Sequence, residues 1–158
     1  MNIISLDFTH IQQLLAMEKA CFPTPWSMDT IKWALSENDI HGVGLQDGNA
    51  IAGYGFLRHS IIDGKPYEQA DLLNIAVTPT YRGLGYGKIL LSHLMNLAWS
   101  AGAEQIFLEV RLSNENAQGL YASFGFCPIG IRKGYYANLN SPLREDGVVM
   151  MAEKKGGS

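Results

Sequence analysis

The sequence has only two cysteines and no cluster of metal-binding side chains. Cys21 and Cys127 lie far apart and form no C-x-x-C pair, and we expect both to be packing residues. A disulfide framework and a cysteine-based zinc site are therefore not expected, and this cysteine usage favours a reducing compartment, the cytoplasm. The four histidines also lack metal-ligand spacing: His10, His41, His59 and His93. We therefore predict that the protein binds no metal.

Positive charge and long apolar runs are also lacking. Charged residues make up 17% of the chain and the net charge is −3, whereas binding to nucleic acid through its phosphates requires a positive surface. No apolar run approaches the roughly 20 residues that cross a bilayer, and the N-terminus lacks the regions of a signal peptide. Neither nucleic acid nor a membrane is therefore an expected partner.

The length and composition predict one domain. A chain of 158 residues with 47% hydrophobic content can bury one sizeable core and is short for two. We expect the domain to comprise residues 1–152 and the polar residues 153–158 to form a flexible tail.

The hydrophobic pattern switches between the periods of strands and helices. Apolar runs predict strands at residues 3–6, 40–45, 51–57, 106–111, 126–131 and 148–151, and a long strand ending at Val77. Helical spacing predicts helices that carry Ile11–Leu15, Ile31–Leu35, Lys88–Ala101 and Ala117–Phe124. Residues 133–144 are expected to form a polar connection. The succession β-α-α-β-β-β-α-β-α-β-β indicates an α/β sandwich on one mixed sheet.

Three alternating glycines join a strand to a helix. Leu72–Val77 is an apolar run, Pro79 ends it, and Gly83, Gly85 and Gly87 precede the helical pattern. Glycine adopts backbone angles closed to other residues and has no Cβ, so its N–H groups can converge on a ligand. Together with the positive end of a helix dipole they can bind a phosphate or diphosphate. A glycine-rich turn without a ligand is the alternative.

Neither of two common phosphate loops matches this stretch. The Walker A pattern requires Ser or Thr after Gly-Lys, and the dinucleotide pattern requires glycine where Lys88 stands. The pattern Arg-x-x-Gly-x-Gly, with Arg82, Gly85 and Gly87 at its fixed positions, resembles the acyl-CoA diphosphate loop of the GNAT N-acetyltransferase superfamily. The resemblance implies acetyl-CoA as co-substrate. It also implies cofactor-binding roles for Ile75, Ala76, Val77, Arg82, Gly83, Leu84, Gly85, Tyr86, Gly87, Lys88, Asn114 and Tyr121.

Glu109 and Tyr121 are the candidate catalytic residues. Glu109 lies inside the apolar run 106–110, and burying an ionised carboxylate is costly unless it is paired or lines a wet cleft. Alternation along a half-exposed strand, with Glu109 solvated or paired to Arg111, explains the position equally well. Tyr121 lies in a helical apolar stripe, where an aromatic residue usually belongs to the core.

Both residues fall in a run that resembles a more specific family. Residues 108–126, together with Pro25-Trp26-Ser27, Leu73–Val77, Arg132–Tyr136 and Arg144-Glu145-Asp146, are similar to the RimI-type ribosomal-protein alanine N-acetyltransferases. The resemblance implies a mostly antiparallel mixed sheet with helices on both faces. It further implies direct attack of an amine on the thioester, with Glu109 as the base, through water, and Tyr121 as the acid.

The same resemblance implies the substrate and its binding residues. The expected substrate is a protein N-terminus, alanine in particular, of a ribosomal protein, and the expected enzyme is a monomer or weak dimer. Trp26, Asn74, Tyr135 and Tyr136 are the expected substrate-binding residues, and Glu145 with Asp146 can attract a basic peptide. The segments 61–69 and 138–143 are unlike the family. Two alternatives are a small-amine acetyltransferase of the same fold and a non-catalytic acyl-CoA-binding module.

Overall fold

A single sheet of seven strands forms the centre of the computed structural model, which describes residues 1–138 and 141–156. The strands are β1 (Asn2–Ser5), β2 (Ile40–Asp47), β3 (Ala50–Ile62), β4 (Lys65–Val77), β5 (Gln105–Arg111), β6 (Cys127–Asn138) and β7 (Ser141–Glu153). Their spatial order is β1-β2-β3-β4-β5-β7-β6. Only β4 and β5 run parallel among these pairs, so the predicted mixed, mostly antiparallel sheet is confirmed.

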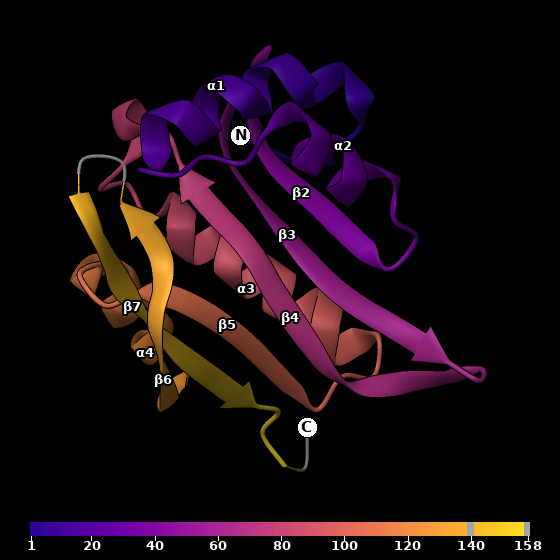
Figure 1. Cartoon of the computed structure of the whole chain (residues 1–158). Helices are drawn as coiled ribbons and strands as arrows, with labels where there is room; N and C mark the ends of the chain where they lie inside the picture. Colours follow the sequence, from indigo (N-terminus) through magenta and orange to yellow (C-terminus); the bar gives the residue numbers. More distant parts are fainter. Residues whose placement is uncertain (139–140, 157–158) are drawn as a thin grey trace.

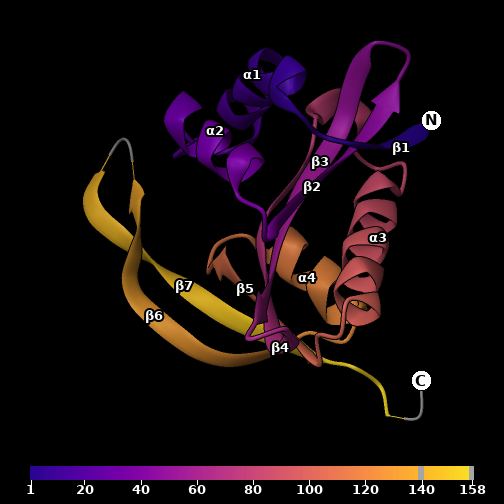
Figure 2. The ribbon, with the colours of Figure 1, turned by 90° about the vertical axis from the view of Figure 1, so that its right-hand side faces the viewer.

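The helices cover both faces of the sheet (Figure 1). They are α1 (Ile11–Cys21), α2 (Met28–Ser36), α3 (Tyr86–Ser100) and α4 (Glu115–Ser123), with short 3-10 turns η1 (Phe8–His10) and η2 (Pro79–Tyr81). Figure 2 shows α1 and α2 on one side of the central strands and α3 and α4 on the other. No helix within the described part of the chain is long and apolar enough to cross a membrane.

Side-chain hydrogen bonds cap the starts of α2 and α4. Ser27 Oγ accepts the Thr30 amide at 3.1 Å at the start of α2, and Asn114 Oδ1 accepts the Ala117 amide at 3.2 Å at the start of α4. Each bond satisfies an N–H group that has no partner inside the helix. The caps therefore set the positions of the loops that precede these helices, and both loops reach the cleft described below.

Two separate clusters of buried residues hold the layers together. Leu14 and Met17 of α1 and Ile31 and Ala34 of α2 pack on Tyr54 and Phe56 of β3. On the opposite face, Leu90, Leu91 and Leu94 of α3 pack with β5, β7 and Phe126. Helices α1 and α3 thus pack on the same central strands from opposite faces of the sheet. This packing fixes the position of the end of β4, where the glycine-rich loop begins.

Strands β4 and β5 pair over only part of their length. Their register runs from Gln69 opposite Gln105 to Asp71 opposite Phe107 and ends there. Beyond this point the two strands are not paired, which leaves a gap in the sheet between residues 72–77 and 108–111. Three cavities of the molecule lie along this gap.

The segment expected to be a polar connection is a β-hairpin instead. β6 continues to Asn138 and β7 begins at Ser141, and Leu139 and Asn140 lie outside the described residues. Polar side chains bond the hairpin backbone: Asp146 Oδ1 accepts the Gly134 amide at 2.9 Å, and Arg144 donates to the Tyr135 carbonyl at 2.9 Å. These bonds explain why a polar, glycine- and proline-containing stretch forms strands.

The predicted boundary of the tail also shifts. Glu153 is the last residue of β7, and the Lys154 amide donates to the Glu104 carbonyl at 2.8 Å. The paired backbone therefore extends into the segment expected to be a tail. Gly157 and Ser158, the end of that segment, lie outside the described residues.

Candidate active site

Three neighbouring cavities follow the gap between β4 and β5. The first, of about 490 Å³, lies against the glycine-rich loop. The second, of about 410 Å³, shares Tyr121 and Asn114 with the first, and the third, of about 510 Å³, shares Glu109 and Tyr136 with the second. The shared residues show that the three cavities adjoin one another along a single cleft. It crosses the sheet from the start of α3 to the β6–β7 hairpin.

The first cavity is built around the loop between β4 and α3. Gly83 and Gly85 have φ angles of 77° and 86°, and Gly85 is the N-cap of α3. Gly87 lies inside the helix, so only two of the three glycines need the left-handed region. A Cβ at Gly87 would meet the Leu120 side chain at 3.5 Å. The loop therefore presents backbone N–H groups of a helix start to the cavity, which suits an anion.

Most of the predicted cofactor-binding residues line this first cavity. They are Ile75, Ala76, Val77, Arg82, Gly83, Gly85, Tyr86, Gly87, Asn114 and Tyr121. Leu84 and Lys88 do not line it, and the Leu84 side chain is exposed. Sequence analysis missed Tyr81 and Asn116 of the lining, because nothing local distinguishes them from surface residues.

Arg82 connects the loop to the end of β4. Its Nε donates to the Val77 carbonyl at 2.9 Å, and the Cys21 thiol lies 3.6 Å from the same oxygen. Burial raises the pKa of the Cys21 thiol, so this side chain is a neutral part of the cleft wall. Cys127, expected to be a packing residue, is exposed on β6.

Glu109 lines the second and third cavities, and only one of its two carboxylate oxygens has a hydrogen-bond partner among the described residues. Its Oε1 accepts from Arg132 Nη1 at 2.7 Å, whereas Oε2 is buried and has no hydrogen-bond partner among the described residues. The side chain of Glu109 is 26% exposed. The suggested pairing of Glu109 with Arg111 is wrong. The carboxylate therefore keeps one acceptor oxygen for a ligand.

Tyr121 separates the first cavity from the second. The residue is 7% exposed, and its ring packs edge-on against Phe126 at a centroid distance of 5.8 Å. Burial raises the pKa of the Tyr121 phenol well above its ordinary value. The phenol therefore stays protonated at neutral pH and can donate a proton or a hydrogen bond. Tyr121 is both a core residue and a cleft residue, so its two interpretations are compatible.

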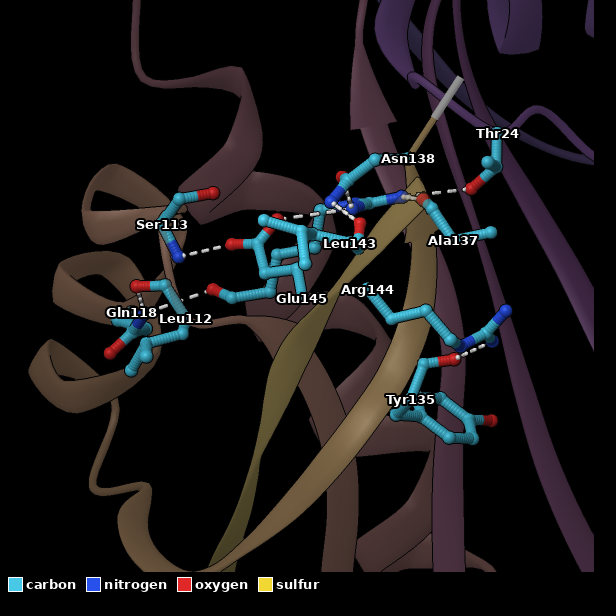
Figure 3. A network of polar contacts seen from close by, with 11 residues as sticks. Thr24, Leu112, Ser113, Gln118, Tyr135, Ala137, Asn138, Leu143, Arg144 and Glu145 are labelled. Carbon is cyan, nitrogen blue, oxygen red and sulfur yellow. Dashed lines mark hydrogen bonds and ion pairs between the residues drawn. The ribbon is translucent and has the colours of Figure 1, made fainter. Parts of the chain in front are cut away.

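Arg111 connects the hairpin to the loop before α2. Figure 3 shows Thr24 of that loop and Ala137, Asn138 and Glu145 of the hairpin in this polar network. The Arg111 guanidinium donates to Glu145 Oε2 at 3.1 Å, to the Ala137 carbonyl at 2.9 Å and to Thr24 Oγ1 at 3.0 Å. Glu145 Oε1 in turn accepts the Ser113 amide at 2.6 Å. Glu145 is therefore occupied within the protein. The suggestion that it attracts a basic peptide is wrong.

The predicted substrate-binding residues gather at the hairpin end of the cleft. Trp26 and Tyr136 line both the second and the third cavity, Asn74 lines the second and Tyr135 the third. Tyr135 and Tyr136 pack edge to face with ring centroids 4.9 Å apart. Burial raises the pKa of Tyr136 to about 12, so its hydroxyl is a donor in the cleft.

Two carboxylates of the cleft were missed by sequence analysis. Asp71 lines the third cavity, and burial raises the pKa of its carboxyl. Glu18 of α1 lines the second cavity and is 1% exposed. Burial also raises the pKa of Glu18. A signal for Glu18 exists, since it follows Leu14 by four residues and so lies on the apolar face of its helix. No group of three side chains suited to a metal ion occurs within residues 1–138 and 141–156.

Known proteins match the chain over nearly its full length. The family model described as Acetyltransferase (GNAT) family matches residues 8–126. The [ribosomal protein bS18]-alanine N-acetyltransferase of Haemophilus influenzae is 36% identical over 151 residues, which cover 95% of this chain and 97% of the relative. The enzyme of the same name from Escherichia coli K12 is 34% identical over 149 residues, with coverages of 94% and 95%.

Solved structures agree with the sequence matches. The crystal structure of the ribosomal-protein-S18-alanine N-acetyltransferase from Escherichia coli superposes with a TM-score of 0.83 at 30% identity, covering 99% of this chain and 97% of that one. Arabidopsis thaliana NAA60 in complex with acetyl-CoA gives a TM-score of 0.82 at 16% identity, with coverages of 96% and 97%. The latter likeness concerns the fold.

Proposed function

The chain belongs to the GNAT acetyltransferase family and is an acetyl-CoA-dependent N-acetyltransferase, and we propose that its substrate is the N-terminal alanine of ribosomal protein bS18. The observation that carries this proposal is the similarity, at 36% identity over nearly the whole chain, to an enzyme named for that reaction. A cleft that continues past Glu109 to an aromatic end at Tyr135 supports a peptide as the acceptor. Such a reaction belongs in the cytoplasm, where ribosomes are.

In this proposal the loop after β4 holds the diphosphate of acetyl-CoA. The positive φ angles of Gly83 and Gly85 and the helix start at Tyr86 support an anion site made of backbone amides from residues 82–88. At Ile75, Ala76 and Val77 the strand β4 pairs with β3 but not with β5, so the N–H groups on its β5 side can orient the acetyl and pantetheine groups. Asn114 lines the same cavity. Acetyl-CoA supplies the activated acetyl group as a thioester.

Glu109 is the proposed base. A peptide α-amine titrates near about 8, so most of it carries a proton at neutral pH and must lose it before attack. The unpartnered Oε2 of Glu109 is the acceptor for this proton, directly or through water, while Arg132 holds Oε1 at 2.7 Å. The ion pair leaves Oε2 as the oxygen available for this proton.

Tyr121 is the proposed acid. The leaving group is a thiolate whose conjugate acid has a pKa near about 8.5, and a protonated phenol can supply its proton. Tyr121 lines both the first and the second cavity, which supports this role. We propose direct transfer to the amine. The Cys21 thiol, whose pKa is raised by burial, is a poor nucleophile for an acyl-enzyme.

The decisive experiment compares acceptors. The purified protein is incubated with acetyl-CoA and, separately, a peptide with the N-terminal sequence of bS18, the same peptide with a blocked α-amine, and free polyamines or amino acids. Mass spectrometry should find one acetyl group on the free alanine amine and none on the blocked peptide. Acetylation of small amines with unmodified peptides would instead identify a small-amine acetyltransferase. Binding of acetyl-CoA without transfer to any amine would identify a binding module.

A further inference from the structure

Glu18 is a buried carboxylate beside the cleft that the proposed chemistry does not use. Its Oε1 accepts the Trp26 amide at 2.8 Å, and its Oε2 accepts Asn74 Nδ2 at 2.9 Å and the Tyr54 hydroxyl. Glu18, Trp26 and Asn74 all line the second cavity. The carboxylate thus joins α1, the loop before α2, β3 and β4 behind the amine site. With 1% exposure it does not contact bulk solvent.

The hydrogen-bonding capacity of these groups restricts the orientation of the Asn74 side-chain amide. A carboxylate accepts hydrogen bonds and donates none, whereas an asparagine side chain has one donor end and one acceptor end. The NH2 group must therefore face Glu18, which leaves the amide oxygen on the other side of the planar group. An amine or a peptide N–H is a donor and needs such an acceptor.

We propose that Glu18 is a positioning residue that orients the Asn74 amide, so that its oxygen receives an N–H of the amine substrate, and holds the Trp26 loop at the same site. This inference rests on the proposed function, because it assigns Asn74 to the acceptor amine. It predicts that Glu18 affects binding of the amine substrate and not of acetyl-CoA.

The variant Glu18→Gln tests the orientation with almost no change in shape. The glutamine side chain presents an NH2 donor where Glu18 Oε2 accepts from Asn74. Two donors would then face each other, so the Asn74 amide is expected to rotate and turn its own NH2 toward the cavity. We expect the KM for an alanine peptide to rise about tenfold, the size expected for one lost hydrogen bond, and the KM for acetyl-CoA to stay within about twofold. The matched control is Tyr54→Phe, which removes the third bond to the same carboxylate from a residue outside the cavities and should leave the peptide KM unchanged.

A rescue variant separates positioning from general damage. In the double variant Glu18→Gln with Asn74→Asp, donor and acceptor exchange places, and an oxygen again faces the cavity. The peptide KM should return to within about threefold of the wild-type value. A double variant as impaired as the two single variants combined would overturn the proposal. So would equal rises in peptide KM for Glu18→Gln and Tyr54→Phe at matched melting temperatures.

A measurement on the wild-type protein keeps the proposal testable if Glu18→Gln does not fold. NMR should show the Asn74 side-chain NH2 protected from exchange and coupled through its hydrogen bond to the Glu18 carboxyl carbon. Rapid exchange of this amide would overturn the proposal. The NMR result does not depend on the substrate, so failure of the wild-type enzyme to acetylate alanine peptides would refute the proposed function separately.

Discussion

Glu109 and Tyr121 differ in what surrounds their reactive atoms. Glu109 has one oxygen held by Arg132 and one without a hydrogen-bond partner among the described residues, whereas the Tyr121 ring is buried and packs against Phe126. In the proposed mechanism the ion pair orients the base, and burial keeps the phenol protonated. These two environments suit opposite directions of proton transfer.

Replacing Glu109 tests the base. Glu109→Gln keeps the shape and the bond from Arg132 but removes the acceptor for the amine proton. We expect kcat to fall about 100-fold or more at neutral pH, with acetyl-CoA binding unchanged, as measured by steady-state kinetics and calorimetry. The control is Glu153→Gln at the end of β7, outside the cleft, which should match the wild type. An unchanged kcat for Glu109→Gln would remove Glu109 from the mechanism.

Replacing Tyr121 tests the acid. Tyr121→Phe keeps the contact with Phe126 and loses only the hydroxyl, so the melting temperature should change little. Turnover should fall about 100-fold for acetyl-CoA. It should recover with a thioester whose leaving thiol is more acidic, since such a thiolate needs no proton. Tyr67→Phe, on the exposed part of β4, is the control. A loss of activity that is equal for both thioesters contradicts the assignment.

At the scale of elements, the β4–α3 junction joins the end of a strand that pairs with β3 but not with β5 to the start of a helix. The Arg82 side chain fastens the loop to Val77, and Gly85 turns the chain into α3 through a left-handed conformation. The end of β4 and the N-terminus of α3 line the same cavity. The geometry of the anion site therefore depends on backbone conformation more than on charged side chains.

The prediction for this element is that Gly85→Ala weakens acetyl-CoA binding. A Cβ at φ of 86° meets no atom within 4 Å, so the cost is strain in the backbone, about 1 kcal/mol or more. We expect the Kd for acetyl-CoA, measured by calorimetry, to rise about tenfold. Gly119→Ala in α4, where a helical backbone accepts alanine, is the control and should stabilise the protein without changing the Kd. Equal Kd values for both variants would contradict the anion site.

Across the whole molecule, the Arg111–Glu145 pair links segments that are distant in sequence. Arg111 lies on β5, and its partners lie on the loop before α2 and on both strands of the hairpin. Hydrogen bonds from Ser113, and then the Arg111 guanidinium, hold the pKa of Glu145 below its ordinary value. The stability that Glu145 contributes is therefore present above its unfolded pKa and is lost as the pH falls through its folded pKa.

Acid unfolding tests this linkage. Between pH 6 and pH 3, Glu145→Gln should lose less stability than the wild type, measured as the shift of the urea midpoint, because the variant lacks the group that must be protonated. The pH dependence of the stability that Glu18 contributes has the opposite sign. Burial raises the pKa of Glu18, so this stability is present at low pH and is lost as the pH rises through the folded pKa. Glu18→Gln should therefore lose more stability than the wild type over the same range. Parallel pH profiles for all three proteins would contradict both assignments.

Local patterns in the sequence were sufficient for the order of the elements and for the anion loop. These patterns depend on residues that are close together in the chain: the periods of strands and helices, the caps Ser27 and Asn114, and the glycines Gly83 and Gly85. The motif around Glu109 and Tyr121 indicated the correct family for the same reason, since it is a contiguous run. The hairpin at residues 133–144 escaped prediction because its sequence is polar and its backbone is held by the side chains of Arg144 and Asp146 on the facing strand.

The sequence by itself determined the fold class, the family and the loop suited to a diphosphate, because each rests on neighbouring residues. Only the tertiary structure decided which charges meet. It pairs Arg111 with Glu145, 34 residues away, and Glu109 with Arg132, and it buries Glu18 against Asn74, 56 residues away. These partners are set by how strands and helices pack, and an ionisable side chain that must be buried takes whichever donor the packing brings within reach.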